Sequence, residues 1–135
     1  MNKLAGIVVG VESEGDISLV EVDVQGTRLF SLVVETPESA DYLEPGKTLF
    51  VMFKESEVSL AIPPLSAISI RNRLPCRVRR VTAGKLLAHL EIEHKAGPIQ
   101  ALITTRALRD LGLDPGDDVL ALVKSTEVVL SGDGR

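Results

Sequence analysis

The sequence is poor in the residues that stack on nucleic-acid bases. It has no tryptophan, and aromatic residues make up only 3% of its 135 residues. Proteins that hold single strands rely on aromatic side chains as stacking platforms. The net charge of -4 gives no general attraction to a polyanion, and the single basic cluster, at residues 77–80, has no aromatic residue nearby. We therefore expect no nucleic-acid partner.

Cysteine and histidine are almost absent. The one cysteine, Cys76, cannot form an intrachain disulfide, and we expect it to be a small core residue on a strand. The two histidines, His89 and His94, have no cysteine or further histidine at metal-ligand spacing. Neither is paired by motif with a serine or cysteine nucleophile. The sequence therefore predicts no bound metal cation and no catalysis.

Long hydrophobic runs are also missing. No apolar stretch approaches 18 residues, and no charged segment followed by an apolar one opens the chain, so we expect a cytoplasmic protein without membrane insertion. Gly46-Lys47-Thr48 resembles the end of a phosphate-binding loop, but the position five residues before Gly46 is Asp41 rather than glycine. We interpret this segment, and the acidic segment 114–118, as turns.

What the chain does contain is an internal repeat at an offset of 70 residues. The segment LEPGKTLFVMFKESEVSL (43–60) aligns without a gap with LDPGDDVLALVKSTEVVL (113–130). Further identities include Asn2/Asn72, Leu4/Leu74 and Val8/Val78. A repeat of this kind indicates two copies of one structural unit. We predict a first module at 1–62, a linker at 63–67 and a second module at 68–135.

Each copy is predicted to be mostly strand. In the first copy, alternating or β-branched runs at 4–12, 17–24 and 28–35 form a meander, a short helix follows Pro37, and two strands at 48–54 and 57–61 complete the unit. The second copy repeats this order. The predicted fold class is all-β, with two tandem five-stranded barrels of the oligonucleotide/oligosaccharide-binding type, each with one short helix.

The second copy also carries hydrogen-bond donors suited to an anion. A short strand is expected to place Ser69 and Arg71 on one face, immediately before Asn72. Further donors occur where a strand meets the helix and where the fourth strand meets the fifth, at Thr104, Thr105, Lys124 and Ser125. No carboxylate belongs to this set, which favours a fully deprotonated oxyanion over a protonated phosphate. Taken singly, Lys124 is also an ordinary strand-end lysine, and Thr104-Thr105 a helix N-cap.

The segments SIRNRLPCRV (69–78) and ITTRALRDLGLDPGDDVLALVKSTEVVL (103–130) closely resemble the molybdate-binding Mop or TOBE domain family. That family carries a Ser-x-Arg-Asn strand, a Leu-x-Leu-x-Pro-Gly turn and an Ile-Lys-Ala/Ser-Ser-x-Val ending. The resemblance covers nearly the whole chain as two tandem modules. It is similar both to the C-terminal regulatory region of molybdate-importer ATPases and to free-standing proteins that buffer molybdate.

The resemblance implies a role for each donor. Ser69 and Arg71 would contact the oxyanion, Asn72 would brace the strand, and the remaining ligands would be Thr104, Thr105, Lys124 and the backbone N–H of Ser125. The family's sites lie between modules or subunits, which implies a homo-oligomer, a dimer or trimer, with Arg71 of one copy near Lys124 of another. Two departures are visible. Ala107 replaces a frequent serine, and the first module has Lys54 beside Glu55 without a Ser-x-Arg strand. Lys54 is the candidate oxyanion ligand of the first module, with a purely structural role as the alternative.

From this resemblance we expect binding of molybdate or tungstate for storage, homeostasis or sensing. The alternative is a regulatory module of a molybdate transporter ATPase or of a transcription regulator. In either case the bound ligand is the oxyanion, with no organic cofactor and no bare metal cation.

Overall fold

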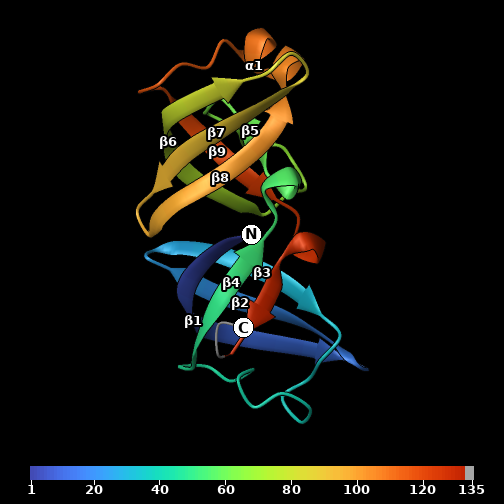
Figure 1. Ribbon diagram of the computed structural model, residues 1–135. Helices are drawn as coiled ribbons and strands as arrows, with labels where there is room; N and C mark the ends of the chain where they lie inside the picture. Colours follow the sequence, from blue (N-terminus) through green and yellow to red (C-terminus); the bar gives the residue numbers. More distant parts are fainter. Residues whose placement is uncertain (133–135) are drawn as a thin grey trace.

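The structure, a computed structural model, describes residues 1–132 and consists of two five-stranded sheets stacked end to end (Figure 1). Its elements in chain order are β1 (Asn2–Glu14), β2 (Ile17–Val24), β3 (Thr27–Val33), β4 (Thr48–Phe53), η1 (Glu55–Glu57), β5 (Ser59–Ala61), β6 (Asn72–Ala83), β7 (Leu87–His94), β8 (Gly97–Thr104), α1 (Thr105–Leu111), β9 (Asp118–Val123), η2 (Ser125–Glu127) and β10 (Val129–Ser131). The predicted all-β class with two five-stranded units is confirmed.

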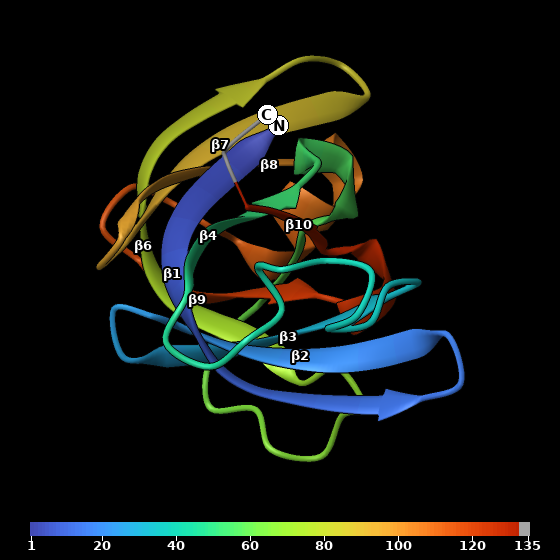
Figure 2. The ribbon, with the colours of Figure 1, turned by 90° about the horizontal axis from the view of Figure 1, so that it is seen from below.

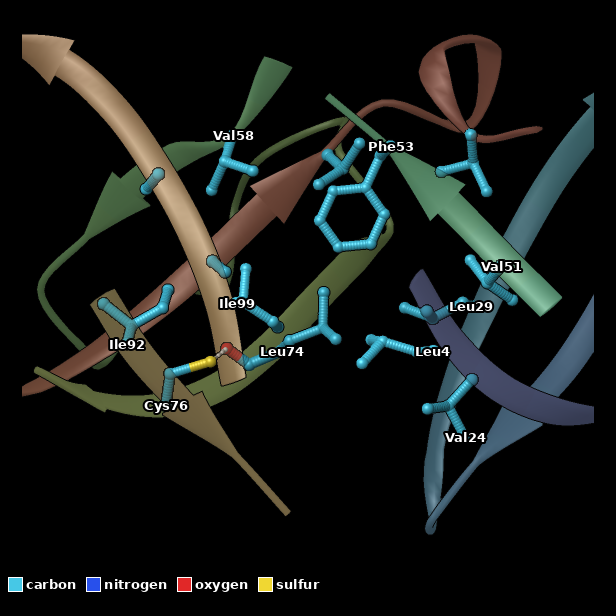
Figure 3. Packing of buried hydrophobic residues seen from close by; sticks show 14 of the residues in the cluster. Leu4, Val24, Leu29, Val51, Phe53, Val58, Leu74, Cys76, Ile92 and Ile99 are labelled. Atoms are coloured by element: carbon cyan, nitrogen blue, oxygen red, sulfur yellow. Dashed lines mark hydrogen bonds between the residues drawn. The ribbon is translucent and has the colours of Figure 1, made fainter. Parts of the chain in front are cut away.

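The strands have the alternating pattern of half-buried sheets. In β2, for example, Val20, Val22 and Val24 are buried, while the residues between them face outward. The inward residues of both sheets belong to one continuous hydrophobic core. Figure 3 shows Leu4 and Leu74, which are equivalent in the repeat, pointing toward one another where the two barrels meet. Each module is small, so sharing a core lets both bury more apolar surface than either could alone.

The two barrels exchange their last strands. The order of the first sheet is β10-β4-β1-β2-β3, and that of the second is β5-β9-β6-β7-β8. After β4 the chain therefore crosses through η1 into the second barrel, and after β9 it crosses back through η2. We define the first barrel as β1–β4 with β10, and the second as β6–β9 with β5. The prediction that each module contains its own fifth strand is wrong. The module boundaries at residues 62 and 68 describe the two copies of the sequence repeat, and they stay a prediction.

The exchange of strands has a physical reason, and the same reason explains why the sequence does not predict it. Because β4 and β9 are equivalent in the repeat, β5 finds the same kind of partner in either barrel. A strand that passes to the neighbouring repeat makes nearly the same contacts as one that stays, which is the principle of domain swapping. The path of a short connection such as η1 decides whether the strand pairs in its own barrel or in the neighbouring one.

Both long strands, β1 and β6, are bent, as Figure 2 shows. The pairing of β1 with β2 shifts between Val8 and Gly10, and that of β6 with β7 shifts at the equivalent place, between Val78 and Arg80. Such bulges bend a strand and increase its twist, which helps a five-stranded sheet curl into a barrel. In the first barrel the edges meet where the Ser31 hydroxyl donates to the Val128 carbonyl at 2.7 Å.

The predicted helix is present only in the second barrel. There α1 begins after Thr104 and ends at Gly112, which has φ 63° and ψ 39°. In the first barrel the equivalent segment forms turns, and the amides of Ser39 and Ala40 both donate to Thr36 O. The prediction of a helix there is wrong. RALRDL is rich in good helix formers, whereas PESADYL begins with proline and contains serine and aspartate. Within 1–132, no helix has the length and apolar character needed to cross a bilayer.

Candidate functional site

Arg71 and Lys124 leave the second barrel side by side. The antiparallel pairing of β6 with β9 ends at Asn72 opposite Val123, and the next residues on the two chains are Arg71 and Lys124. Asn72 and Val123 are buried, whereas both cations are exposed, as strand alternation requires. The backbone positions of two cationic residues are therefore neighbours within a single chain. The expectation that Arg71 of one copy approaches Lys124 of another is not needed to bring these residue types together.

Ser69 and Arg71 do not lie on a strand as predicted. β6 begins at Asn72, and the residues before it have no strand partner because β9 has already turned into η2. Both side chains are exposed, and the Arg71 guanidinium donates to the carbonyl of Ile68. Ser69 thus lies in the irregular segment that leads into β6, two residues before Arg71 in the sequence.

Ser125 lies on the other chain of this junction. It is the first residue of η2, which Lys124 precedes in an extended conformation with φ -64° and ψ 144°. The Glu127 amide closes the turn on Lys124 O at 2.9 Å. Because η2 packs against β3 of the first barrel, Arg71, Lys124 and Ser125 stand where the second barrel meets the first. We call this place the β3 junction.

Asn72 is a structural residue in this structure. It is fully buried, its amide donates to Phe30 O at 2.8 Å, and its side-chain oxygen accepts from Phe30 N at 2.7 Å. The side chain therefore continues β3 of the first barrel like a short piece of strand. With both polar atoms committed to Phe30, Asn72 has no place among ligands of an exposed anion, although it fixes the start of β6 beside Arg71.

The equivalent residue Asn2 makes the same contacts in the other direction. Its amide donates to Gln100 O at 2.9 Å, and its side-chain oxygen accepts from Gln100 N at 2.7 Å. Asn2 and Asn72 thus form a reciprocal pair of clamps between the barrels. Asparagine at both equivalent positions of the repeat was the signal that could have revealed this contact, but sequence reasoning did not predict a contact between the barrels from it.

The two threonines serve the fold of the second barrel. The Thr104 side chain caps α1 by accepting from Ala107 N at 3.0 Å. Thr105 is buried and donates to Gly84 O at 2.9 Å. The N-cap interpretation of this pair is therefore confirmed, and the buried Thr105 offers nothing to a ligand in solvent. Only Thr104 is exposed.

Within one chain, Thr104 does not join the cations of the β3 junction. It lines a cavity of about 450 Å³ together with Ser56 of η1, and η1 packs against β8. Lys54 immediately precedes η1, so Lys54 and Thr104 belong to the opposite side of the molecule, which we call the β8 junction. There Glu55 occupies the position that Ser125 has at the β3 junction, and it adds a carboxylate beside Lys54. The structure thus divides the predicted donors into two groups.

No other side-chain chemistry competes with these groups among the described residues. Burial raises the pKa of Cys76 to about 12, so the thiol stays protonated, and the prediction of a core cysteine is confirmed. Residues 1–132 contain no group of three or more His, Cys, Asp or Glu side chains that could hold a metal ion.

Comparison with known proteins agrees with the repeat. The TOBE domain family matches residues 1–60 and 68–130. A solved structure of the cytoplasmic molybdate-binding protein ModG, with molybdate bound, is 26% identical, covers 96% of this chain and 94% of its own, and superposes with a TM-score of 0.89.

Two curated relatives share parts of the sequence. The molybdenum transport protein ModE of Azotobacter vinelandii is 29% identical over 96% of this chain and 49% of its own length. The molybdenum import ATP-binding protein ModC of Pasteurella multocida is 34% identical over 67% of this chain and 26% of its own length. The chain therefore spans about a quarter to a half of these two relatives.

Proposed function

Because the chain belongs to the TOBE domain family, we propose that it binds molybdate, or the similar tungstate, and serves in the storage or homeostasis of that oxyanion. The observation that carries the proposal is the position of Arg71 and Lys124, each one residue beyond the Asn72–Val123 pair that ends the β6–β9 ladder. An exposed pair of unlike cations, with hydroxyls on both chains, is an arrangement suited to an anion of charge -2. The likeness to ModG, which was solved with molybdate bound, supports the choice of ligand.

In the proposed site each residue has a separate task. Arg71 supplies a planar fork of N–H donors, and Lys124 supplies a compact charge that can follow the anion. Ser69 and Ser125 add hydroxyl or backbone donors from the two chains that leave the ladder. Since no carboxylate belongs to this group, a proton-free oxyanion is favoured over hydrogen phosphate, which needs an acceptor for its proton. The proposed role is binding, without a catalytic step.

A second copy of the chain would complete the site. Thr104 faces away from the cations in its own chain, so it can reach an anion at the β3 junction only from a neighbouring molecule. We therefore include a homo-oligomer, a dimer or trimer with shared sites, in the proposal. A cytoplasmic location belongs to it as well, in agreement with the description of ModG.

Titration calorimetry with molybdate, tungstate, sulfate and phosphate in parallel tests the ligand. We expect the two larger oxyanions to bind and the smaller sulfate to bind more weakly, because a site wide enough for molybdate leaves donors out of reach of sulfate. Arg71→Ala should weaken molybdate binding at least about tenfold, because a charge-assisted hydrogen bond contributes about 1.5–3 kcal/mol. Arg80→Ala removes an exposed arginine elsewhere on β6 and serves as the matched control. Equal affinity in both variants would contradict the proposed site.

The second candidate function is regulatory. Here the chain would be the oxyanion-sensing part of a transporter ATPase or of a transcription regulator, which is favoured by its match to portions of ModC and ModE. Binding would then change an interface with another protein. Co-purification of the chain with a molybdate transporter ATPase, dependent on molybdate, would support this function. Binding of several anions by an assembly of this chain alone would support storage.

A further inference from the structure

The outer ends of the two barrels carry opposite charge, although the repeat makes them equivalent in fold. At the first barrel, segments 10–20 and 31–46 contain seven carboxylates and no lysine or arginine. The equivalent segments of the second barrel, 80–90 and 101–116, contain four Lys or Arg residues and two Asp residues. Figure 1 shows α1 at one end of the molecule and the 36–46 connection at the other.

The basic end of the second barrel is hollowed and partly apolar. A cavity of about 790 Å³ is lined by three cations and one carboxylate together with two leucines and a threonine: Lys85, Arg106, Arg109, Asp110, Leu86, Leu87 and Thr104. Leu86 is 75% exposed and Leu87 is 55% exposed, which is unusual for leucines beside a cavity. Within residues 1–132 none of the three cations forms an ion pair. We call Lys85, Leu86, Leu87, Arg106 and Arg109 the basic end.

The first barrel presents the complementary surface. Glu12 and Glu14 are exposed on β1, and Glu14 lies opposite Ile17 in the β1–β2 ladder. Val34 immediately follows the last residue of the β2–β3 ladder, where Ser18 lies opposite Val33. Ile17 is 43% exposed and Val34 is 81% exposed. We call these four residues, with Asp16, the acidic end. The acidic end therefore combines exposed apolar side chains with carboxylates, and the basic end combines exposed leucines with cations.

We propose that the basic end of one copy of this chain binds the acidic end of a second copy. Contact between the two ends would cover the exposed leucines with Ile17 and Val34 and would pair Arg106 and Arg109 with carboxylates. Substitution, not fold, creates the complementarity: Leu86, Arg106 and Arg109 replace Asp16, Thr36 and Ser39 at the equivalent positions. A contact between unlike surfaces is heterologous, so it repeats around a closed ring or along an open filament. The proposal rests on charge placement and does not depend on oxyanion binding.

Sedimentation velocity with charge-reversed variants tests the contact. R106E/R109E gives a chain whose two ends are both acidic, and E12K/E14K places two lysines in the acidic end, where they would face the cations of the basic end. We expect each variant alone to sediment as a smaller species than the wild type at low salt, because like ends repel. An equimolar mixture of the two variants should restore the larger species, since an acidic end then meets a basic end. Association of the wild type should weaken in about 1 M salt, where the screening length falls to about 3 Å.

Controls separate the contact from other causes. K95E makes the same charge change as R106E at the turn between β7 and β8, away from both ends, and should leave association unchanged. These measurements are made without any added oxyanion, so that failure of this contact is distinguished from failure of the proposed oxyanion site. A wild-type monomer at low salt, single-variant association equal to that of the wild type, or a mixture that fails to recover the larger species would each overturn the proposal.

Discussion

The two barrels share a fold and a reciprocal clamp, but they differ at the junctions where a ligand could bind. At the β3 junction, Arg71 and Lys124 follow the last pair of a ladder, and Ser125 comes next. At the β8 junction, the positions equivalent to Lys124 and Ser125 hold Lys54 and Glu55. One duplicated scaffold thus carries a junction rich in hydrogen-bond donors, the β3 junction, and a junction that contains a carboxylate, the β8 junction. The comparison teaches that the scaffold conserves backbone geometry, while a few side chains decide which junction suits an anion.

The clamps should be equivalent in strength, and their removal should have the largest effect on stability. Asn72→Ala leaves the amide and carbonyl of Phe30 without partners, and Asn2→Ala does the same to Gln100. We expect each variant to lower the free energy of unfolding by about 2–4 kcal/mol, because unsatisfied buried polar groups cost about 1–3 kcal/mol each. Urea denaturation measures both. A large loss for one variant and none for the other would show that the two clamps are not equivalent.

The junctions should differ in their contribution to anion binding. Lys124→Ala should weaken molybdate binding about tenfold or more, because it removes one of two paired cations. Lys54→Ala should change the affinity much less, since the carboxylate of Glu55, which lies 2.6 Å from the Met1 ammonium, makes that junction less suited to an anion. Calorimetry on the two variants gives the ranking directly. The reverse order would place the binding site at the β8 junction.

Barrel closure offers a smaller contrast. The Ser31 hydroxyl donates to Val128 O in the first barrel, whereas the equivalent residue in the second barrel is Ala101. Ser31→Ala should destabilise the protein by about 1 kcal/mol, the typical net contribution of a buried hydrogen bond. Thermal unfolding should show a lowered midpoint for this variant. An unchanged midpoint would mean that the first barrel closes without this bond, as the second barrel does.

The smallest expected effect is a pH dependence that comes from the second barrel. His94 accepts from Ala96 N at 3.0 Å through Nδ1, so Nε2 carries the proton and donates to Thr27 Oγ1 of the first barrel at 2.9 Å. Burial lowers the pKa of His94 from 6.5, with a further contribution from Lys95. The remaining charged groups at the adjacent cavity are Arg77, Glu93 and Asp118.

Since the folded protein holds His94 neutral, the unfolded chain takes up a proton first as the pH falls below about 6.5. Stability is therefore complete above that value and decreases as the pH falls toward the lower pKa of the folded state. His94→Val copies the equivalent residue Val24 and should flatten this dependence between pH 7 and pH 5, as urea denaturation at each pH would show. The exposed His89, changed to Gln, is the control, and an equal change in both variants would exclude this explanation.

Much of this fold followed from patterns in the sequence, and the parts that did not follow share a cause. The alternation in 17–24 and 86–94 predicted β2 and β7 because burial on one face of a strand requires a period of two. The helix at 37–43 was wrong because Pro37 can begin a helical turn, whereas the serine and aspartate that follow it favour turns. The strand at Ser69–Arg71 was wrong because alternation cannot show whether a partner strand is present.

The candidate site divides in the same way. Residue types and their positions relative to the repeat pointed to Arg71 and Lys124, and the register then placed both at one end of a ladder. Sequence reasoning placed Asn72 in the site as a brace and Thr105 there as a ligand, whereas the structure buries both in bonds to backbone groups. A polar side chain reads the same whether it binds a ligand or a carbonyl, so only its burial and partners separate the two roles.

By itself the sequence determined the two copies, their strands, and the charges and donors placed on each, because these depend on local pattern and composition. Tertiary structure decided that β5 and β10 exchange barrels, that Asn2 and Asn72 lock the barrels together, and that Thr104 faces a different junction from Lys124. These features depend on contacts between residues far apart in a duplicated chain. Two equivalent partners are then available for each strand, and only packing in three dimensions selects one of them.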